Sequence, residues 1–110
     1  MTITWGGVQF TGPHQLNSCD MPNESGLYSI MIKADPVNKP NTYTVVYFGE
    51  SENFQDRITS SHHKYDCWQK QVGSDNAIYF GLHVMPNSTE EARGELEAQL
   101  IQKIRTTCND

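Results

Sequence analysis

Alternation of apolar and polar residues marks three stretches of the chain and predicts three β-strands. They cover residues 26–34, residues 43–49, which are rich in β-branched and aromatic residues, and residues 77–85. A period of two sends successive side chains to opposite faces of a sheet, so each strand presents one apolar face. Residues 35–42 hold two prolines and two asparagines, which are turn formers. The first two strands therefore most simply pair as a hairpin with a long connection.

Helix-start signals follow the second strand. Asn53 can cap a helix that begins at Phe54 and runs to about His62, with Phe54, Ile58 and Ser61 on one face. A second, short helical turn is expected around residues 65–71. A turn at residues 73–76 then leads into the third strand.

The last helix opens at Ser88, which stands three residues before Glu91 with the spacing of a capping box. The pattern predicts that this helix runs to about Thr107. Its apolar stripe consists of Ala92, Leu96, Leu100, Ile101 and Ile104.

The order of the predicted elements is ββαβα. It indicates an α/β (α+β) fold in which helices flank a small three-stranded antiparallel sheet. At 110 residues the chain suits a single domain, residues 1–110. Residues 1–25 are interpreted as an irregular lead-in that Trp5, Val8 and Phe10 anchor to the core.

Neither a signal peptide nor an apolar run long enough to cross a membrane is present in the sequence. The three cysteines, Cys19, Cys67 and Cys108, are an odd number and form no CxxC pair. Free thiols in a reducing cytosol are therefore expected, rather than a disulfide framework or a zinc site. The predicted location is cytoplasmic.

The formal net charge is −5, from 13 acidic and 8 basic residues. Contacts with phosphates dominate the affinity of proteins for DNA, so an acidic chain predicts weak and salt-sensitive binding on its own. A protein partner that supplies affinity for DNA is compatible with this charge.

Glu97 has an unusual position for a charged residue. On a helix it falls between Leu100 and Ile101, inside the apolar stripe. Carboxylates seldom face a core unless they are paired or bound to a cation. One interpretation is an ion pair with Arg93, one turn earlier. The other is a metal ligand.

Several segments between Glu24 and Asn109 together resemble the GIY-YIG nuclease domain, which is named after its two strand motifs. The matching segments are Gly26-Leu27-Tyr28, Tyr47-Phe48-Gly49, Asn53-Phe54-Gln55-Asp56-Arg57-Ile58, Leu96-Glu97-Ala98-Gln99-Leu100-Ile101, and an ending that closes on Asn109. Single matches of this kind are weak, but their conjunction in one order is much less expected by chance. Gly26, Gly49, Asn53 and Asn109 are the structural positions of the motifs, and Asn109 is expected to tie the tail to the sheet.

The resemblance implies a metal-dependent endonuclease that hydrolyses DNA with one Mg²⁺ or Mn²⁺. Glu97 would hold the ion, Arg57 would clamp a phosphate, and Tyr28 and Tyr47 would face the active site. The plainer interpretations are strand tyrosines with solvated hydroxyls, and a surface arginine that pairs with Glu50 or Asp56.

Four departures from the family pattern are present. Tyr28 and Tyr47 stand nineteen residues apart, which implies an insertion in the hairpin loop. His62 and His63 come five and six residues after Arg57, whereas family members often carry a histidine one turn after it. An acidic residue at position 50 beside a phosphate site would repel the substrate. Thr106 replaces a proline of the family ending.

Candidates for contact with nucleic acid are His62, Lys64 and Lys70, with Lys103 and Arg105 at the last helix. Three functions stay open: a stand-alone nuclease acting on DNA, a catalytically weak or inactive binding or scaffold module that needs a partner, and a hydrolase of another phosphodiester.

Overall fold

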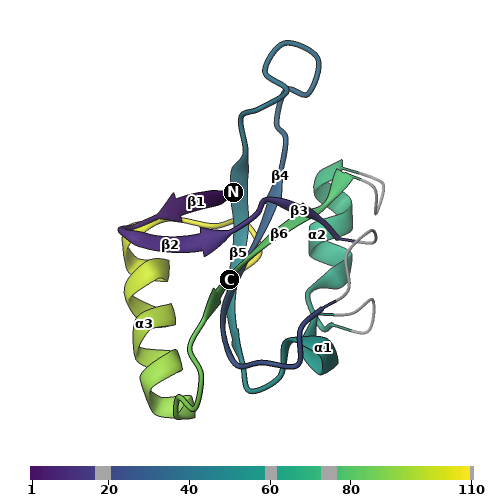
Figure 1. Cartoon of the computed structure of the whole chain (residues 1–110). Coiled ribbons are helices and arrows are strands. Elements are labelled where there is room, and N and C mark those ends of the chain that lie inside the picture. The colour runs from purple at the N-terminus through teal and green to yellow at the C-terminus, as the bar shows by residue number, and fades with distance from the viewer. Residues whose placement is uncertain (17–20, 59–61, 73–76, 110) are drawn as a thin grey trace.

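The computed structural model describes residues 1–16, 21–58, 62–72 and 77–109 (Figure 1). In chain order the elements are β1 (Thr2–Trp5), β2 (Val8–Thr11), β3 (His14–Gln15), β4 (Gly26–Ile32), β5 (Thr44–Ser51), α1 (Phe54–Arg57), α2 (Tyr65–Val72), β6 (Tyr79–Val84) and α3 (Glu90–Lys103). The fold is mixed α+β, as the sequence predicts.

The main sheet is antiparallel and has the order β3-β6-β4-β5. Its three long strands are the three predicted ones, and β4 and β5 form the expected hairpin. The loop between them, residues 33–43, projects beyond the end of the sheet (Figure 1). At its base the ammonium group of Lys33 lies 5.5 and 5.1 Å from the ring centres of Tyr43 and Tyr79.

The prediction of a three-stranded sheet with an irregular lead-in was wrong. Residues 14–15 pair with β6 as a fourth strand, and β1 and β2 form a separate two-stranded hairpin. The signal for this hairpin is Gly6-Gly7 between two alternating tetrapeptides. Both glycines adopt positive φ, at 56° and 84°, as tight two-residue hairpin turns require.

Two apolar clusters, one on each face of the main sheet, form the core. The first joins Tyr28, Ile30 and Phe80 of the sheet to Trp68 of α2. The second joins Leu27, Met31, Phe48 and Phe10 to Leu100 of α3. Trp5 and Val8 pack against the second cluster, so the three predicted anchors of the lead-in are confirmed. Helices α2 and α3 accordingly lie on opposite sides of the sheet (Figure 1).

The first helix is shorter than its sequence pattern predicts. Asn53 caps α1 by accepting the Gln55 N–H at 3.0 Å, as expected. The helix ends at Arg57 and not near His62, because Ile58 leaves the helical region at φ −90°, ψ 79°. Phe54 and Ile58 are both buried, whereas the predicted positions Ser61 and 73–76 lie outside the described residues. The expected short helix at 65–71 is confirmed as α2.

The last helix begins one residue later than predicted. Thr89 is the N-cap and accepts the Ala92 N–H at 3.1 Å. Ser88 is engaged elsewhere, since its Oγ accepts a hydrogen bond from Arg93 Nη1 at 3.1 Å. Helix α3 ends at Lys103 and not near Thr107, because Ile104 is extended. Ala92 is exposed rather than part of the apolar stripe.

The C-terminal tail runs along the outer edge of β5. The Cys108 N–H donates to the Val46 carbonyl at 2.8 Å. The Asn109 side chain accepts the Phe48 N–H and donates to the Phe48 carbonyl, both at 2.8 Å. The expected structural role of Asn109 is therefore confirmed, and Thr106 donates a hydrogen bond to the same side chain.

A disulfide joins this tail to helix α2. Cys67 and Cys108 are bonded across a separation of 41 residues, with their Cα atoms 5.8 Å apart. The prediction of free thiols was wrong for these two cysteines, because no local spacing motif marks a pair so far apart; Cys19 lies outside the described residues.

None of the helices in the described ranges is long and apolar enough to cross a membrane.

Candidate active site

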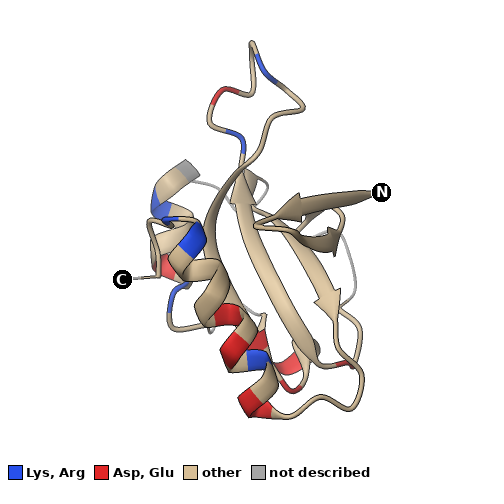
Figure 2. Ribbon diagram, turned by 90° about the vertical axis from the view of Figure 1, so that its left-hand side faces the viewer, with Lys and Arg blue, Asp and Glu red and all other residues tan. Residues whose placement is uncertain are grey.

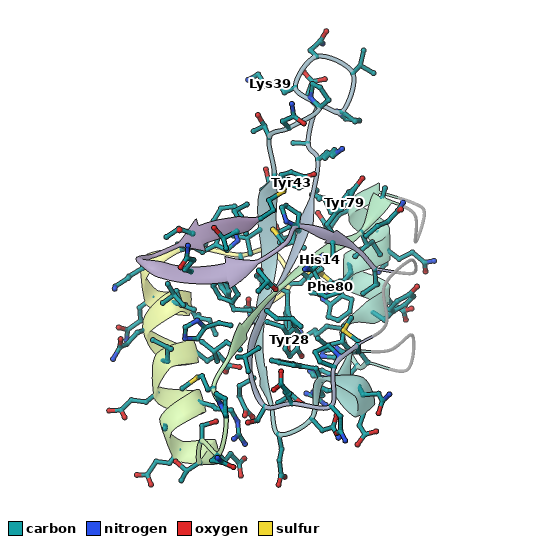
Figure 3. All side chains as sticks on the ribbon, in the orientation of Figure 1. His14, Tyr28, Lys39, Tyr43, Tyr79 and Phe80 are labelled. Carbon is teal, nitrogen blue, oxygen red and sulfur yellow. A yellow bond between two sulfur atoms is a disulfide. The ribbon has the colours of Figure 1, made fainter. Side chains whose placement is uncertain are left out.

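Tyr28 and Tyr47 project from the same face of the sheet. The register pairs Tyr28 with Gly49 and Ile30 with Tyr47, and opposed residues of antiparallel strands share a face. The two ring centres lie 5.9 Å apart. Tyr28 is completely buried, and 7% of the surface of Tyr47 is exposed to solvent. The interpretation of strand tyrosines with solvated hydroxyls is therefore wrong for Tyr28, which Figure 3 shows inside the molecule.

The two motif glycines leave room for this packing. A Cβ at Gly49 would overlap the ring and hydroxyl of Tyr28. Gly26 has φ 154°, and a Cβ there would collide with the His83 carbonyl and lie 2.9 Å from the Met85 nitrogen. The glycines at both motif positions are therefore explained by close approach of neighbouring groups in the sheet.

His62 closes over Tyr28. Its Nε2 lies 2.6 Å from the Tyr28 hydroxyl, and its Nδ1 accepts the Lys64 N–H at 2.9 Å. Its ring packs against Trp68 at 4.5 Å and Tyr47 at 5.3 Å. Burial, together with the positive charges of Arg57, His63 and Lys64, lowers the pKa of His62 to about 4. The imidazole is therefore neutral at pH 7.

Arg57 reaches the two tyrosines from the end of α1. Burial raises the pKa of both tyrosines, and the positive charge of Arg57 opposes that increase in each. It also lies 3.4 Å from His63 Nδ1. No ion pair joins Arg57 to Glu50 or Asp56 in the described part of the chain, so the surface-pair interpretation is not supported.

A pocket opens on the solvent side of Arg57. Its volume is about 510 Å³, and Ser51, Glu52, Asn53, Asp56 and Arg57 line it. Ser51 Oγ donates to the Asn53 carbonyl at 2.8 Å and accepts the Asn53 N–H at 3.0 Å. These bonds hold the turn that leads into α1, the helix on which Arg57 lines the pocket.

Glu97 approaches the tyrosines from the other side of β5. Its helix packs against β5, the edge strand, on the face of the sheet opposite Tyr28. Burial and then the charge of Glu50 raise the pKa of Glu97, while the charge of Arg57 lowers it. The Glu97 charge also acts on Tyr47. The charges of Glu97 and Arg57 therefore both act on Tyr47, and Arg57 also acts on Glu97.

The partner of Arg93 is Glu50 and not Glu97. Arg93 Nε donates to Glu50 Oε2 at 2.8 Å, and Arg93 Nη1 donates to the Ser88 carbonyl at 2.7 Å. Arg93 is 4% exposed and Glu50 is 25% exposed. Glu50 is thus paired with a buried guanidinium, and its repulsion of phosphate stays a prediction. Arg93 stands three residues before Leu96 and seven before Leu100, so helical spacing places it on the apolar side of α3. This spacing is the sequence signal for a buried arginine.

The candidate nucleic-acid contacts come from different parts of the fold, and one of them is not at the surface. His62 is buried, and Lys70 is exposed on α2. Lys103 Nζ donates to the Gly6 carbonyl at 3.4 Å, and Arg105 is exposed beyond the end of α3. Acidic residues gather along the first half of α3 (Figure 2). The described charges therefore form no continuous basic path on the α3 side of the site.

Comparison of the chain with protein-family models, with curated proteins and with solved structures finds no significant match.

Proposed function

We propose that this protein is a metal-dependent endonuclease that hydrolyses DNA phosphodiester bonds by a one-metal mechanism. The observation that carries the proposal is that the charges of Glu97 on α3 and of Arg57 on α1 both act on Tyr47 of β5. These are the positions that the resemblance to GIY-YIG nucleases selects, and they are far apart in the sequence.

A divalent cation suits the chemistry at Glu97. The carboxyl is partly buried beside the charge of Glu50, which makes an isolated negative charge unfavourable. Mg²⁺ usually keeps several waters and takes one or two carboxylates together with substrate phosphates. Among the described residues no three acidic, histidine or cysteine side chains gather as a closed metal cage. Glu97, completed by water and phosphate oxygens, would therefore hold Mg²⁺ or Mn²⁺ weakly.

When bound, such an ion supplies Lewis-acid stabilisation of a phosphate oxygen. The side chains of the chain supply the rest. Arg57 is exposed at the pocket and can pair with a non-bridging phosphate oxygen, which offsets the charge that develops in the transition state. A tyrosine hydroxyl beside it can orient the attacking water.

An alternative is a catalytically weak or inactive binding module that acts with a protein partner. The net charge of −5 and the acidic first half of α3 favour it, because few phosphates can be neutralised. A partner that supplies affinity for DNA would reconcile the acidic surface with either function. The two proposals differ in whether purified protein cuts DNA.

Supercoiled plasmid distinguishes them, because one cut converts it to a nicked circle. Purified protein is incubated at low salt with Mg²⁺, with Mn²⁺, and with EDTA. We expect nicking with either metal, none with EDTA, and loss of nicking in Glu97→Ala but not in Glu95→Ala, a matched exposed position on the same helix. An intact plasmid in every arm, with folded protein, would refute the endonuclease proposal and favour the binding module.

A further inference from the structure

We propose that the Cys67–Cys108 disulfide is a redox switch beside the candidate site: a dithiol reductant opens it and thereby releases the C-terminal tail, residues 105–109, from the edge strand β5. The release of the tail is a property of the fold alone. Its effect on DNA cleavage rests on the proposed endonuclease function. The inference follows from what holds the tail, what the tail holds, and which sulfur a reductant can reach.

The tail has few bonds to the sheet. In the described part of the chain, the Cys108 N–H donates one hydrogen bond to β5 and the Asn109 side chain makes two, all at 2.8 Å. The two buried side chains of the tail, Thr106 and Cys108, are small. Ordering one residue costs about as much free energy as one such hydrogen bond returns. The covalent link is therefore what keeps the tail in place.

Helix α2 is the fixed end of this link. Trp68, which follows Cys67, is completely buried, and its ring centre lies 4.5 Å from that of His62 and 5.6 Å from that of Tyr47. Cys108 belongs to the same buried cluster as Trp68 and Tyr47. With the disulfide closed, the tail cannot leave β5 unless this packed helix moves with it.

The tail covers the part of β5 that carries Tyr47. The Val46 carbonyl accepts the bond from Cys108, and the backbone N–H and carbonyl of Phe48 bond the side chain of Asn109. Val46 and Phe48 are the neighbours of Tyr47 on either side. Because β5 is an edge strand, release of the tail takes these bonds from its outer edge, and a segment with fewer bonds fluctuates more. Tyr47 is then held less firmly.

A reductant reaches the disulfide at Cys67, which is partly exposed, whereas Cys108 is 1% exposed. A thiolate of the dithiol attacks Cys67 Sγ, the bond between the two protein sulfurs breaks, and Cys108 leaves as a thiolate that takes up a proton. The second thiol of the reductant then attacks the reductant sulfur of this mixed disulfide, closes the reductant's own disulfide and releases the Cys67 thiol. Two electrons pass from the dithiol to the protein, and its two protons end on the two cysteines.

The test of tail release needs no DNA. Backbone ¹⁵N relaxation is measured on the oxidised protein and after reduction with dithiothreitol, in a Cys19→Ser background so that only two cysteines remain. We expect the order parameters of residues 106–109 to fall from about 0.85 to below about 0.6 on reduction. Met85, whose N–H donates to the Ser25 carbonyl at 2.8 Å, should stay near the rigid value. A tail that stays rigid with both thiols shown to be free would overturn the switch, and so would a loss of order that includes Met85.

Asn109→Ala is the matched variant, because it removes the two bonds to Phe48 and leaves the disulfide intact. In the oxidised form of this variant, residues 106–108 should stay ordered, and reduction should release them as in the wild type. Release of these residues while the disulfide is still closed would overturn the assignment of the disulfide as the lock.

The effect on the site is measured by single-turnover cleavage with Mg²⁺, after the reductant has been removed without air. The reduced protein should cut about 10-fold more slowly than the oxidised protein, since small displacements at a reacting site are costly. Oxidised glutathione should restore the rate, and Cys67→Ser should cut at the reduced rate with or without dithiothreitol. Equal rates in the two forms would overturn the link to the site. If neither form cuts, the relaxation data still decide the release of the tail, and only the proposed function is refuted.

Discussion

Lowering the pH from 7 to 5 should destabilise this protein through His62. The pKa of His62 is about 4 in the folded protein, because burial and neighbouring positive charges oppose protonation, and its ordinary value is 6.5. The unfolded chain therefore takes up a proton below pH 6.5 that the folded chain refuses, so stability falls as the pH falls toward 4. The full difference corresponds to about 3 kcal/mol, and about 2 kcal/mol of it is lost by pH 5.

Urea denaturation of the wild type and of His62→Gln at pH 7 and pH 5 isolates this contribution. Other groups titrate in the same interval, including Glu97, whose raised pKa acts in the opposite direction. They are common to both proteins and cancel in the comparison. We expect the free energy of unfolding of the wild type to fall by about 2 kcal/mol more than that of His62→Gln. Equal losses in the two proteins would refute the reasoning, because His62 would then titrate normally.

Two further predictions concern the fold. Gly49→Ala should lower the free energy of unfolding by about 2–3 kcal/mol, because the added Cβ would overlap the ring of Tyr28. Gly94→Ala on α3, where an added Cβ meets nothing within 4 Å, should raise it by about 0.5–1 kcal/mol. A Gly49→Ala protein that is as stable as the wild type in urea titrations would contradict the packing. Reduction of the Cys67–Cys108 disulfide, whose cysteines are 41 residues apart in sequence, should lower the free energy of unfolding by about 2–4 kcal/mol. Denaturation with and without a reductant measures this change. The same denaturation midpoint in both conditions, with both thiols shown to be free after reduction, would count against the disulfide.

Local patterns predicted the elements with strong periodicity. The three long strands, the cap at Asn53 and the role of Asn109 were predictable, since alternation, capping and the ending motif are read over short windows. The strand at 14–15 is only two residues long, which is too short to show an alternating pattern, and it forms by pairing with β6. Its existence is a property of the tertiary fold.

Partners distant in sequence were beyond such reasoning. The Arg93–Glu50 pair spans 43 residues, and the spacing on α3 pointed to Glu97 instead. Spacing also cannot show that Tyr28 is fully buried under His62, because that cover comes from a segment 34 residues away. The residue types of the candidate site were predictable from the motifs, whereas the burial of Tyr28 and its contact with His62 required the fold.

The most direct test of the central claim is the rate at which a fluorescently labelled DNA duplex is cut as Mn²⁺ is increased. Wild type and two isosteric variants, Glu97→Gln and the exposed control Glu95→Gln, are compared under single-turnover conditions. The proposal predicts a rate that rises with Mn²⁺ and saturates in the wild type and in Glu95→Gln, and that stays at background in Glu97→Gln at every concentration. A Glu97→Gln protein that cuts as fast as the wild type would contradict it, because the carboxylate at the edge of β5 would then have no part in the reaction.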